Sequence, residues 1–237
     1  LNTDAQFLSI ELARLGISVI HQSTVGDNRE RLLAQLKEAA DRSDIIILSG
    51  GLGPTPDDLT KEVCCEFFGK KMFLHEPTVE KIKTYFSTKG MEMAQNNLKQ
   101  AMLPKDCVIF PNDNGTAPGM AIEKDGVHIL VLPGPPRELK PMFRNCAVPY
   151  LMQFSDRIIV SHNIRTFGIG ESLMAESVND LFDAENPTVA PYAKDGEALL
   201  RVTAMARTKE EAENLCEPVI NEIKNRLDGF VYGVDYT

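Results

Sequence analysis

Two short runs of aliphatic residues constrain the fold more than any other feature of this sequence. Asp44–Leu48 and Val127–Leu132 are nearly continuous in Ile, Leu and Val, whereas a strand with one face in water would alternate apolar and polar residues. An amphipathic helix is predicted directly before the first run, at Arg29–Ala40. This order predicts an α/β domain with a doubly wound, mainly parallel sheet covered by helices on both faces.

Upstream of these runs, helical spacing ends at Leu15, where Gly16 is a predicted C-cap, and Ile17–Ile20 is predicted to form a short strand. After Pro149 the pattern changes to β-α-β-β-α, which predicts a small α+β domain with an antiparallel sheet. We place the boundary near residues 150–157, giving domains 1–152 and 153–237. The expected elements of the second domain are strands Arg157–Phe167, Thr188–Ala193 and Ala198–Ala206 and helices Glu171–Phe182 and Lys209–Leu227.

Charge and cysteine usage exclude several functional classes. The net charge is −9, and residues 155–237 hold 8 basic against 15 acidic side chains, a net charge of −7. Nonspecific nucleic-acid binders and anionic-membrane binders need a basic face, so we expect neither activity. The five cysteines show no C-x-x-C spacing and the four histidines are scattered. A disulfide framework and a structural zinc site are therefore disfavoured, and a reducing cytoplasm is the expected location.

The run SGGLGPTPDDLTKE (49–62) follows a buried strand and opens a helix. Ligands bind at this place in open α/β sheets, because glycines let backbone N–H groups approach an anion and the helix start is electropositive. A glycine-rich turn with Asp57 or Asp58 as an N-cap is the simpler interpretation. Two adjacent carboxylates repel each other unless a cation lies nearby, which favours a phosphate site with Mg²⁺ or Mn²⁺.

Three further loops carry weaker signals. Asp27 lies between a predicted strand and a helix, and is either an N-cap or another carboxylate at the same sheet edge. The segment 114–119 (NGTAPG) has small side chains, and 132–138 (LPGPPRE) comes after the second aliphatic run. Three prolines fix a rigid path, so a preformed ligand wall is expected there.

Four segments together resemble the CinA family (competence- and damage-inducible protein A). They are SGGLGPTPDDLTKE, NNLKQAMLP, NDNGTAPGM and LPGPPRELKPMF, in this order and spacing. In that family a molybdopterin-binding-like domain precedes a small KH-like domain, which FGIGESLMAESVNDL and PTVAPYAKDGEALLRVTA resemble. The resemblance covers nearly the whole chain.

This resemblance implies an ADP-ribose pyrophosphatase that hydrolyses ADP-ribose to AMP and ribose 5-phosphate with a divalent metal, Mg²⁺ or else Mn²⁺ or Co²⁺. Asp57 and Asp58 are the expected metal ligands, and Asp27 is either a further ligand or the group that orients the attacking water. These three aspartates form the expected catalytic set. The expected substrate-binding residues are Gly50, Gly51, Gly53, Thr55, Thr60, Gly115, Thr116, Pro118, Gly119, Gly134, Pro135 and Pro136.

The sequence departs from the family pattern in three places. Relatives have a strand and a glycine-containing loop before the segment that matches Asn2–Asp4, so we expect a piece of chain before Leu1. Pro56 stands where many relatives have His, and Lys99 where many have Arg. We therefore carry over neither a base contact nor a phosphate contact to these two positions.

Other functions remain open. The same fold could bind molybdopterin with adenylyl transfer, or act as a non-catalytic nucleotide sensor for a nicotinamide mononucleotide deamidase domain, which long relatives carry after their KH-like domain. We do not expect residues 1–237 themselves to have deamidase activity. RNA binding is disfavoured because Gly168-Ile169-Gly170-Glu171 lacks the G-x-x-G spacing and basic neighbours of nucleic-acid KH domains. Phe167, Ile169 and Leu173 are candidates for packing against the first domain or a second subunit, and the resemblance favours a homodimer.

Overall fold

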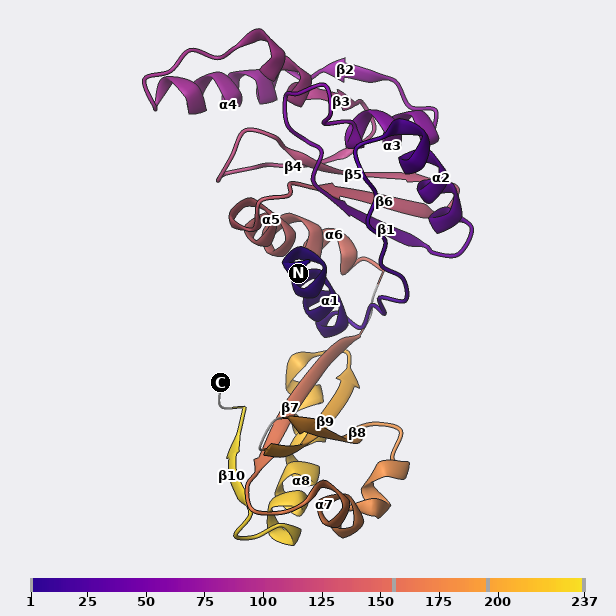
Figure 1. Ribbon diagram of the computed structural model, residues 1–237, viewed down its shortest axis with the longest axis vertical. Helices are drawn as coiled ribbons and strands as arrows, with labels where there is room; N and C mark the ends of the chain where they lie inside the picture. Colours follow the sequence, from indigo (N-terminus) through magenta and orange to yellow (C-terminus); the bar gives the residue numbers. More distant parts are fainter. Residues whose placement is uncertain (1, 155–156, 195–196, 236–237) are drawn as a thin grey trace. The chain divides into compact units, whose positions relative to one another are not determined.

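The computed structural model describes residues 2–154, 157–194 and 197–235 and divides the chain into two compact units (Figure 1). The first unit combines Leu1–Leu8 with His21–Leu151, and the second combines Ser9–Ile20 with Met152–Thr237. Helix α1 (Thr3–Arg14) therefore contributes to both units. Ser155 and Asp156, inside the expected boundary region, lie outside the described residues, as do Leu1, Tyr236 and Thr237.

The first unit is an α/β structure in which α2 and α3 cover one face of a sheet and α5 and α6 the other, so the predicted class is confirmed (Figure 1). Helix α2 and strand β6 have the predicted bounds. The helices are α2 (Arg29–Ala40), α3 (Thr60–Phe67), α4 (Glu76–Ser87), α5 (Pro136–Met142) and α6 (Val148–Leu151), with the 3-10 segment η1 (Gln95–Ala101) and the π segment η2 (Phe143–Ala147). The strands are β1 (Ile45–Ser49), β2 (Met72–Leu74), β3 (Met102–Pro104), β4 (Val108–Phe110), β5 (Gly119–Lys124) and β6 (Val127–Leu132).

The larger sheet of this unit is mixed rather than mainly parallel. Its strand order is β1-β6-β5-β4, and only β1 and β6 pair in parallel, while β5 pairs antiparallel with both β6 and β4. The cause is a tight hairpin between β5 and β6, in which Asp125 and Gly126 have φ values of 53° and 82°. Asp-Gly is a preferred pair for such a two-residue turn, and this signal marks the antiparallel connection.

The structure confirms the end of α1 and corrects the prediction for the segment after it. Gly16 has a φ of 73°, and the Ile17 N–H donates to the Leu12 carbonyl over 3.0 Å, which closes the helix as the C-cap prediction required. The strand predicted at Ile17–Ile20 is wrong. A strand needs a hydrogen-bonded neighbour, and no described strand pairs with this segment, whose Ile20 side chain is 77% exposed.

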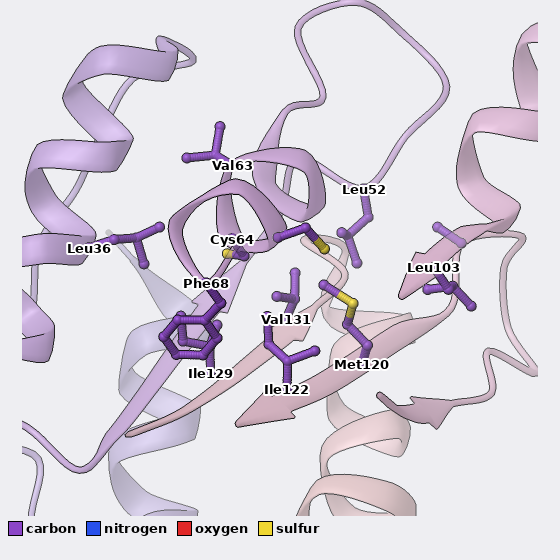
Figure 2. Close-up of a cluster of buried hydrophobic side chains, with 12 residues drawn as sticks. Leu36, Leu52, Val63, Cys64, Phe68, Leu103, Met120, Ile122, Ile129 and Val131 are labelled. Carbon is purple, nitrogen blue, oxygen red and sulfur yellow. The ribbon is translucent and has the colours of Figure 1, made fainter. Parts of the chain in front are cut away.

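The main core of the first unit lies between the sheet and helices α2 and α3 (Figure 2). Ile129 and Val131 of β6 alternate with residues that face the opposite side of the sheet, where Leu130 and Leu132 are also fully buried. Both faces of β6 are therefore covered, which explains its unbroken aliphatic sequence. Cys64 and Cys65 lie in this core, and burial raises the pKa of Cys65 to about 12. This confirms the expectation that they are neutral packing residues.

The second unit is the predicted α+β structure. Its sheet has the order β10-β7-β9-β8 and all its pairs are antiparallel. The elements are β7 (Ile158–Thr166), α7 (Glu171–Ser177), the 3-10 segment η3 (Asn179–Asp183), β8 (Thr188–Lys194), β9 (Glu197–Ala206), α8 (Lys209–Arg226) and β10 (Val231–Val234). The predicted helix Glu171–Phe182 is interrupted at Val178, whose φ of −128° is not helical. Strand β10 was not predicted.

A separate core holds the second unit together. Val202 and Leu200 of β9 pack with Ala212, Cys216 and Ile223 of α8, and all five are fully buried. Helix α8 begins at a reciprocal cap in which the Thr208 side chain accepts from the Glu211 N–H and the Glu211 carboxylate accepts from the Thr208 N–H. Within the described residues, no helix combines the length and apolar character that crossing a bilayer requires.

Candidate functional site

The glycine-rich loop leaves β1 in a conformation that depends on its first two glycines. Gly50 and Gly51 have φ values of 91° and 67°. The Gly50 N–H donates to the Leu132 carbonyl over 2.9 Å, and the Gly51 carbonyl accepts from the Thr60 N–H over 3.2 Å. A Cβ on Gly51 would lie 2.1 Å from the Thr60 Oγ1, so no other residue fits. The loop is thus tied to β6 at one end and to the start of α3 at the other.

The LPGPPRE loop lies directly beside the glycine-rich loop. Strands β1 and β6 run in parallel, so both loops emerge at the same sheet edge. A Cβ built on Gly134 would lie 3.3 Å from the Gly50 Cα, which shows how closely the two backbones approach. The structure therefore brings Gly50 and Gly134 together, whereas their role in substrate binding stays a prediction.

Asp58 organises the tip of the glycine-rich loop. Its Oδ2 accepts hydrogen bonds from the Thr55 N–H over 2.9 Å and from the Thr55 hydroxyl over 2.6 Å. Burial raises the pKa of this carboxyl, but the bonds from Thr55 and the Gly53 backbone and the charge of Lys99 outweigh burial, so the pKa lies below its ordinary value. Gly53 has no room for a side chain, because a Cβ there would lie 2.4 Å from the Asp58 Oδ2. Asp58 is therefore an ionised carboxylate that closes a turn.

Lys99 fastens this turn from the other side. Its Nζ donates to the carbonyls of Thr55 and Asp58 over 2.7 and 2.5 Å, and the Glu62 carboxylate lies 3.7 Å away. Lys99 therefore holds the backbone of the Thr55–Asp58 turn in place through these two hydrogen bonds. The signal that could have found it is the spacing of NNLKQAMLP after the glycine-rich run.

Lys61 is the most deeply buried charged side chain near the loop, with 2% exposure. Its Nζ donates to the carbonyls of Gln100, Met102 and Lys99 over 2.7, 3.2 and 3.3 Å, so each of its three donors has an acceptor. Burial lowers the pKa of Lys61 to about 8, although the neighbouring Glu62 opposes this shift. No sequence pattern singles out this residue.

The other two expected catalytic carboxylates are exposed. Asp57 lies at the tip of the glycine-rich loop. Asp27 precedes α2, but the N-cap is Asn28, whose Oδ1 accepts from the Arg31 N–H over 3.0 Å. The N-cap interpretation of Asp27 is therefore wrong. Among the described residues Asp27 makes no hydrogen bond to the glycine-rich loop, so its catalytic role stays a prediction.

The donor set suits a metal ion only in part. In the part of the chain that the structure describes, no group of three or more His, Cys, Asp and Glu side chains could hold a metal ion by itself. Asp57 and Asp58 offer two neighbouring carboxylates, and one oxygen of Asp58 is already engaged by Thr55. Mg²⁺ commonly takes one or two carboxylates and completes its shell with water and substrate phosphates. The donor chemistry of Asp57 and Asp58 is compatible with such a shared site.

Two residues that no sequence pattern revealed, Asn112 and Glu138, hold the GTAPG segment in place. Glu138, in the first turn of α5, is 9% exposed, and its Oε2 accepts from the Asn112 Nδ2 over 2.9 Å. Gly115 lies against this carboxylate and Thr116 is half-buried beside it in the chain. Pro118 is buried, and Gly119 is the first residue of β5, where a Cβ would lie 2.6 Å from the Val131 carbonyl. This close contact requires glycine at position 119, and the substrate-binding role of Gly119 stays a prediction.

Comparison with known sequences accounts for most of the chain. Residues 1–153 match the family described as "Probable molybdopterin binding domain", and residues 161–233 match the "Damage-inducible protein CinA KH domain". The chain belongs to the CinA family. The predicted family is thereby confirmed, together with the combination of an α/β and an α+β domain.

Several CinA-family relatives are similar over almost the whole chain. CinA-like proteins of Dictyoglomus turgidum and Dictyoglomus thermophilum are each 53% identical over 234 residues, which covers 98% of this chain and 57% of theirs. A crystal structure of the protein CinA, of unknown function, from Thermoplasma acidophilum is 30% identical with a TM-score of 0.57. That likeness covers 63% of this chain and 87% of the other. The chain thus spans little more than half the length of the two Dictyoglomus relatives.

Proposed function

We propose that the first unit is a metal-dependent pyrophosphatase that hydrolyses the diphosphate of ADP-ribose to AMP and ribose 5-phosphate. The observation that carries the proposal is the junction of Gly50 and Gly134, which joins two loops at one sheet edge. The glycine-rich loop runs on from this junction to Asp57 and Asp58. Glycines at this junction put no side chain between a phosphate and the loop backbone, where N–H groups such as that of Gly51 can donate to phosphate oxygens. The CinA-family resemblance supplies the substrate class.

Each group at this edge has a distinct role in the proposed reaction. Gly51 binds phosphate oxygens through its backbone N–H. The N–H groups of Gly50 and Gly53 are engaged by the Leu132 carbonyl and the Asp58 carboxylate, so these two glycines shape the loop instead of donating to phosphate as the sequence predicts. Asp57 and Asp58 hold the metal. When bound there, Mg²⁺, or else Mn²⁺ or Co²⁺, would supply positive charge that offsets the charge developing on the diphosphate. Asp27 orients the attacking water or completes the ligand set. Thr55, Thr60, Thr116, Pro118, Gly119, Pro135 and Pro136 complete the proposed substrate-binding set.

Asp57→Asn tests the proposal most directly, because Asp57 is exposed whereas Asp58 also closes the Thr55 turn. We expect kcat/KM for AMP release from ADP-ribose to fall by about 100-fold or more in the presence of Mg²⁺, since a metal ligand is lost. Excess EDTA should abolish release by the unaltered chain. Asp125→Asn is the matched control, because it removes an equivalent exposed charge from the β5–β6 turn. Unchanged turnover in Asp57→Asn would refute the site.

One comparison favours a second candidate. The family matched by residues 1–153 is described as molybdopterin-binding, and the same loops could hold the phosphate of a pterin for adenylyl transfer. Calorimetric titration with ADP-ribose separates the alternatives. Binding without AMP release supports a non-catalytic sensor that serves a deamidase domain elsewhere in a longer protein, whereas no binding of ADP-ribose favours the pterin.

We further propose that the chain forms a homodimer in the cytoplasm. The exposed Phe167 and Leu173 side chains, 72% and 57% accessible, are apolar surface suited to a subunit contact. The five cysteines are all free thiols, in keeping with a reducing compartment. Sedimentation equilibrium of the full chain and of Phe167→Ser tests the dimer, which the substitution should weaken.

A further inference from the structure

A buried carboxylate lies beneath the loop that carries the GTAPG segment. Glu138 is held in the first turn of α5, where its N–H donates to the Pro135 carbonyl over 2.8 Å. Its side chain is largely removed from solvent, and the exposed Arg137 approaches its Oε1 only to 3.6 Å. Burying a carboxylate is costly unless hydrogen bonds offset the lost hydration, so its partners determine its role.

The main partner of Glu138 is the side chain of Asn112, which is 4% exposed. The Asn112 Nδ2 donates to the Glu138 Oε2 and to the Ala117 carbonyl, each over 2.9 Å. Its Oδ1 accepts from the Asn114 N–H over 3.0 Å. Both donors of the amide are therefore used, and its oxygen has a partner. One side chain thus joins the two ends of the loop to the start of α5.

The fit of Gly115 shows independently that the loop rests on this pair. A Cβ at Gly115 would lie 2.1 Å from the Glu138 Oε2 and 2.8 Å from the Asn112 Nδ2. The backbone of the loop therefore touches the carboxylate directly, and a side chain at position 115 would have to displace Glu138 from Asn112. This contact, and not an unusual φ, favours glycine.

We propose that Asn112 and Glu138 are positioning residues that lock the Gly115–Pro118 segment onto the Gly134–Pro136 loop and so fix the wall that meets the nucleotide. The assignment to the nucleotide wall rests on the proposed function. The lock itself rests on the hydrogen bonds and the glycine contact. Neither residue touches the substrate, and both act through the loop backbone.

The test exchanges donor and acceptor. Asn112→Asp removes two donors and sets a carboxylate against Glu138, so amide hydrogen exchange of residues 112–118 should accelerate about tenfold or more, with β6 changed less than about twofold. Adding Glu138→Gln to Asn112→Asp restores an amide–carboxylate pair of reversed polarity but not the donor to the Ala117 carbonyl, so exchange should fall to a rate between those of Asn112→Asp and the unaltered chain. Asn114→Asp is the matched control, because it adds the same charge to an exposed position of this loop.

A second pair of variants covers the case in which Asn112→Asp fails to fold. Glu138→Gln alone can still accept from Asn112 and should leave loop exchange within about threefold, whereas Glu138→Ala should accelerate it about tenfold. Equal acceleration in the loop and in β6, or no acceleration in either, would overturn the lock.

Kinetics then separates the lock from the proposed function. If the unaltered chain releases AMP, Asn112→Asp should raise KM for ADP-ribose about tenfold with a smaller change in kcat, and the double variant should recover part of this loss. If loop exchange responds as expected but KM does not, the lock stands and its link to the nucleotide is wrong. If the unaltered chain releases no AMP, the proposed function fails while hydrogen exchange still decides the lock.

Discussion

Lys61 shows how a single residue can couple stability to pH. Its three hydrogen bonds to backbone carbonyls satisfy the ammonium group but do not replace its hydration, and burial holds its pKa at about 8 instead of 10.5. Between these two pH values the unfolded chain binds a proton that the folded chain has released. The free energy of unfolding should therefore rise with pH in this window, by on the order of 3 kcal/mol at most.

Lys61→Met should remove this rise, because methionine fills a similar volume without a charge. Urea unfolding at several pH values from about 7.5 to about 10.5, which bracket the two pKa values, measures the difference between the two proteins. Lys124→Met is the matched control, since Lys124 is exposed and also donates to a carbonyl at α3, that of Phe68 over 3.3 Å. Identical pH slopes for Lys61→Met and the unaltered chain would contradict the assignment.

At the scale of the element, helix α8 depends on its first turn. Thr208 and Glu211 satisfy two backbone N–H groups that would otherwise lack partners. Thr208→Ala should lower the free energy of unfolding of the second unit by about 1 kcal/mol, whereas Glu211→Gln preserves the reciprocal bond and should cost less. Thermal unfolding of both variants checks the order, and a larger loss in Glu211→Gln would contradict it.

The elements also show where the sequence was informative. The continuous apolar run of β6 and the periodicity of α2 predicted both elements correctly, because the covered sheet face determines such patterns. Strands β2 and β4 are only three residues long, too short for periodicity to develop. Ile17–Ile20 has a strand-like composition but no partner among the described strands. The local sequence of a segment does not determine whether a neighbouring strand is available to pair with it.

The residues of the candidate site likewise fall into those that the sequence predicts and those that it does not. Glycines with positive φ, such as Gly50 and Gly51, were predictable because few other residues adopt that conformation. Asn112 and Lys61 were not, because their partners are backbone carbonyls and side chains that only the folded chain brings near. Motifs therefore indicate the loops, whereas the side chains that support them are visible only in the structure.

At the scale of the whole molecule, the two units should respond to pH in opposite directions. In the second unit His162 lies between two carboxylates, with Nδ1 2.5 Å from the Asp235 Oδ2 and Nε2 2.7 Å from the Glu213 Oε2. Burial lowers the pKa of His162, but the hydrogen bonds to Asp235 and Glu213 outweigh burial and raise it above 6.5. The stabilisation is complete below pH 6.5 and is lost as pH rises through the raised pKa.

We therefore expect the second unit to weaken as pH rises above 6.5, while the first unit gains stability above about pH 8 through Lys61. Hydrogen exchange of β7 and β6 peptides, corrected for intrinsic rates, reports on the two units separately. His162→Gln should abolish the trend in β7 and leave β6 unchanged. A parallel trend in both strands would show that the units do not unfold separately.

The second unit consists of two segments that are far apart in the sequence, Ser9–Ile20 and Met152–Thr237. A single boundary drawn along the sequence therefore cannot describe this unit. An excised fragment starting at Met152 would lack the Ser9–Ile20 segment of its own unit, including Leu12, which is 5% exposed in the intact chain. The missing piece is short enough to supply as a synthetic peptide. The second unit is thus a natural candidate for fragment complementation, in which added peptide restores a truncated partner.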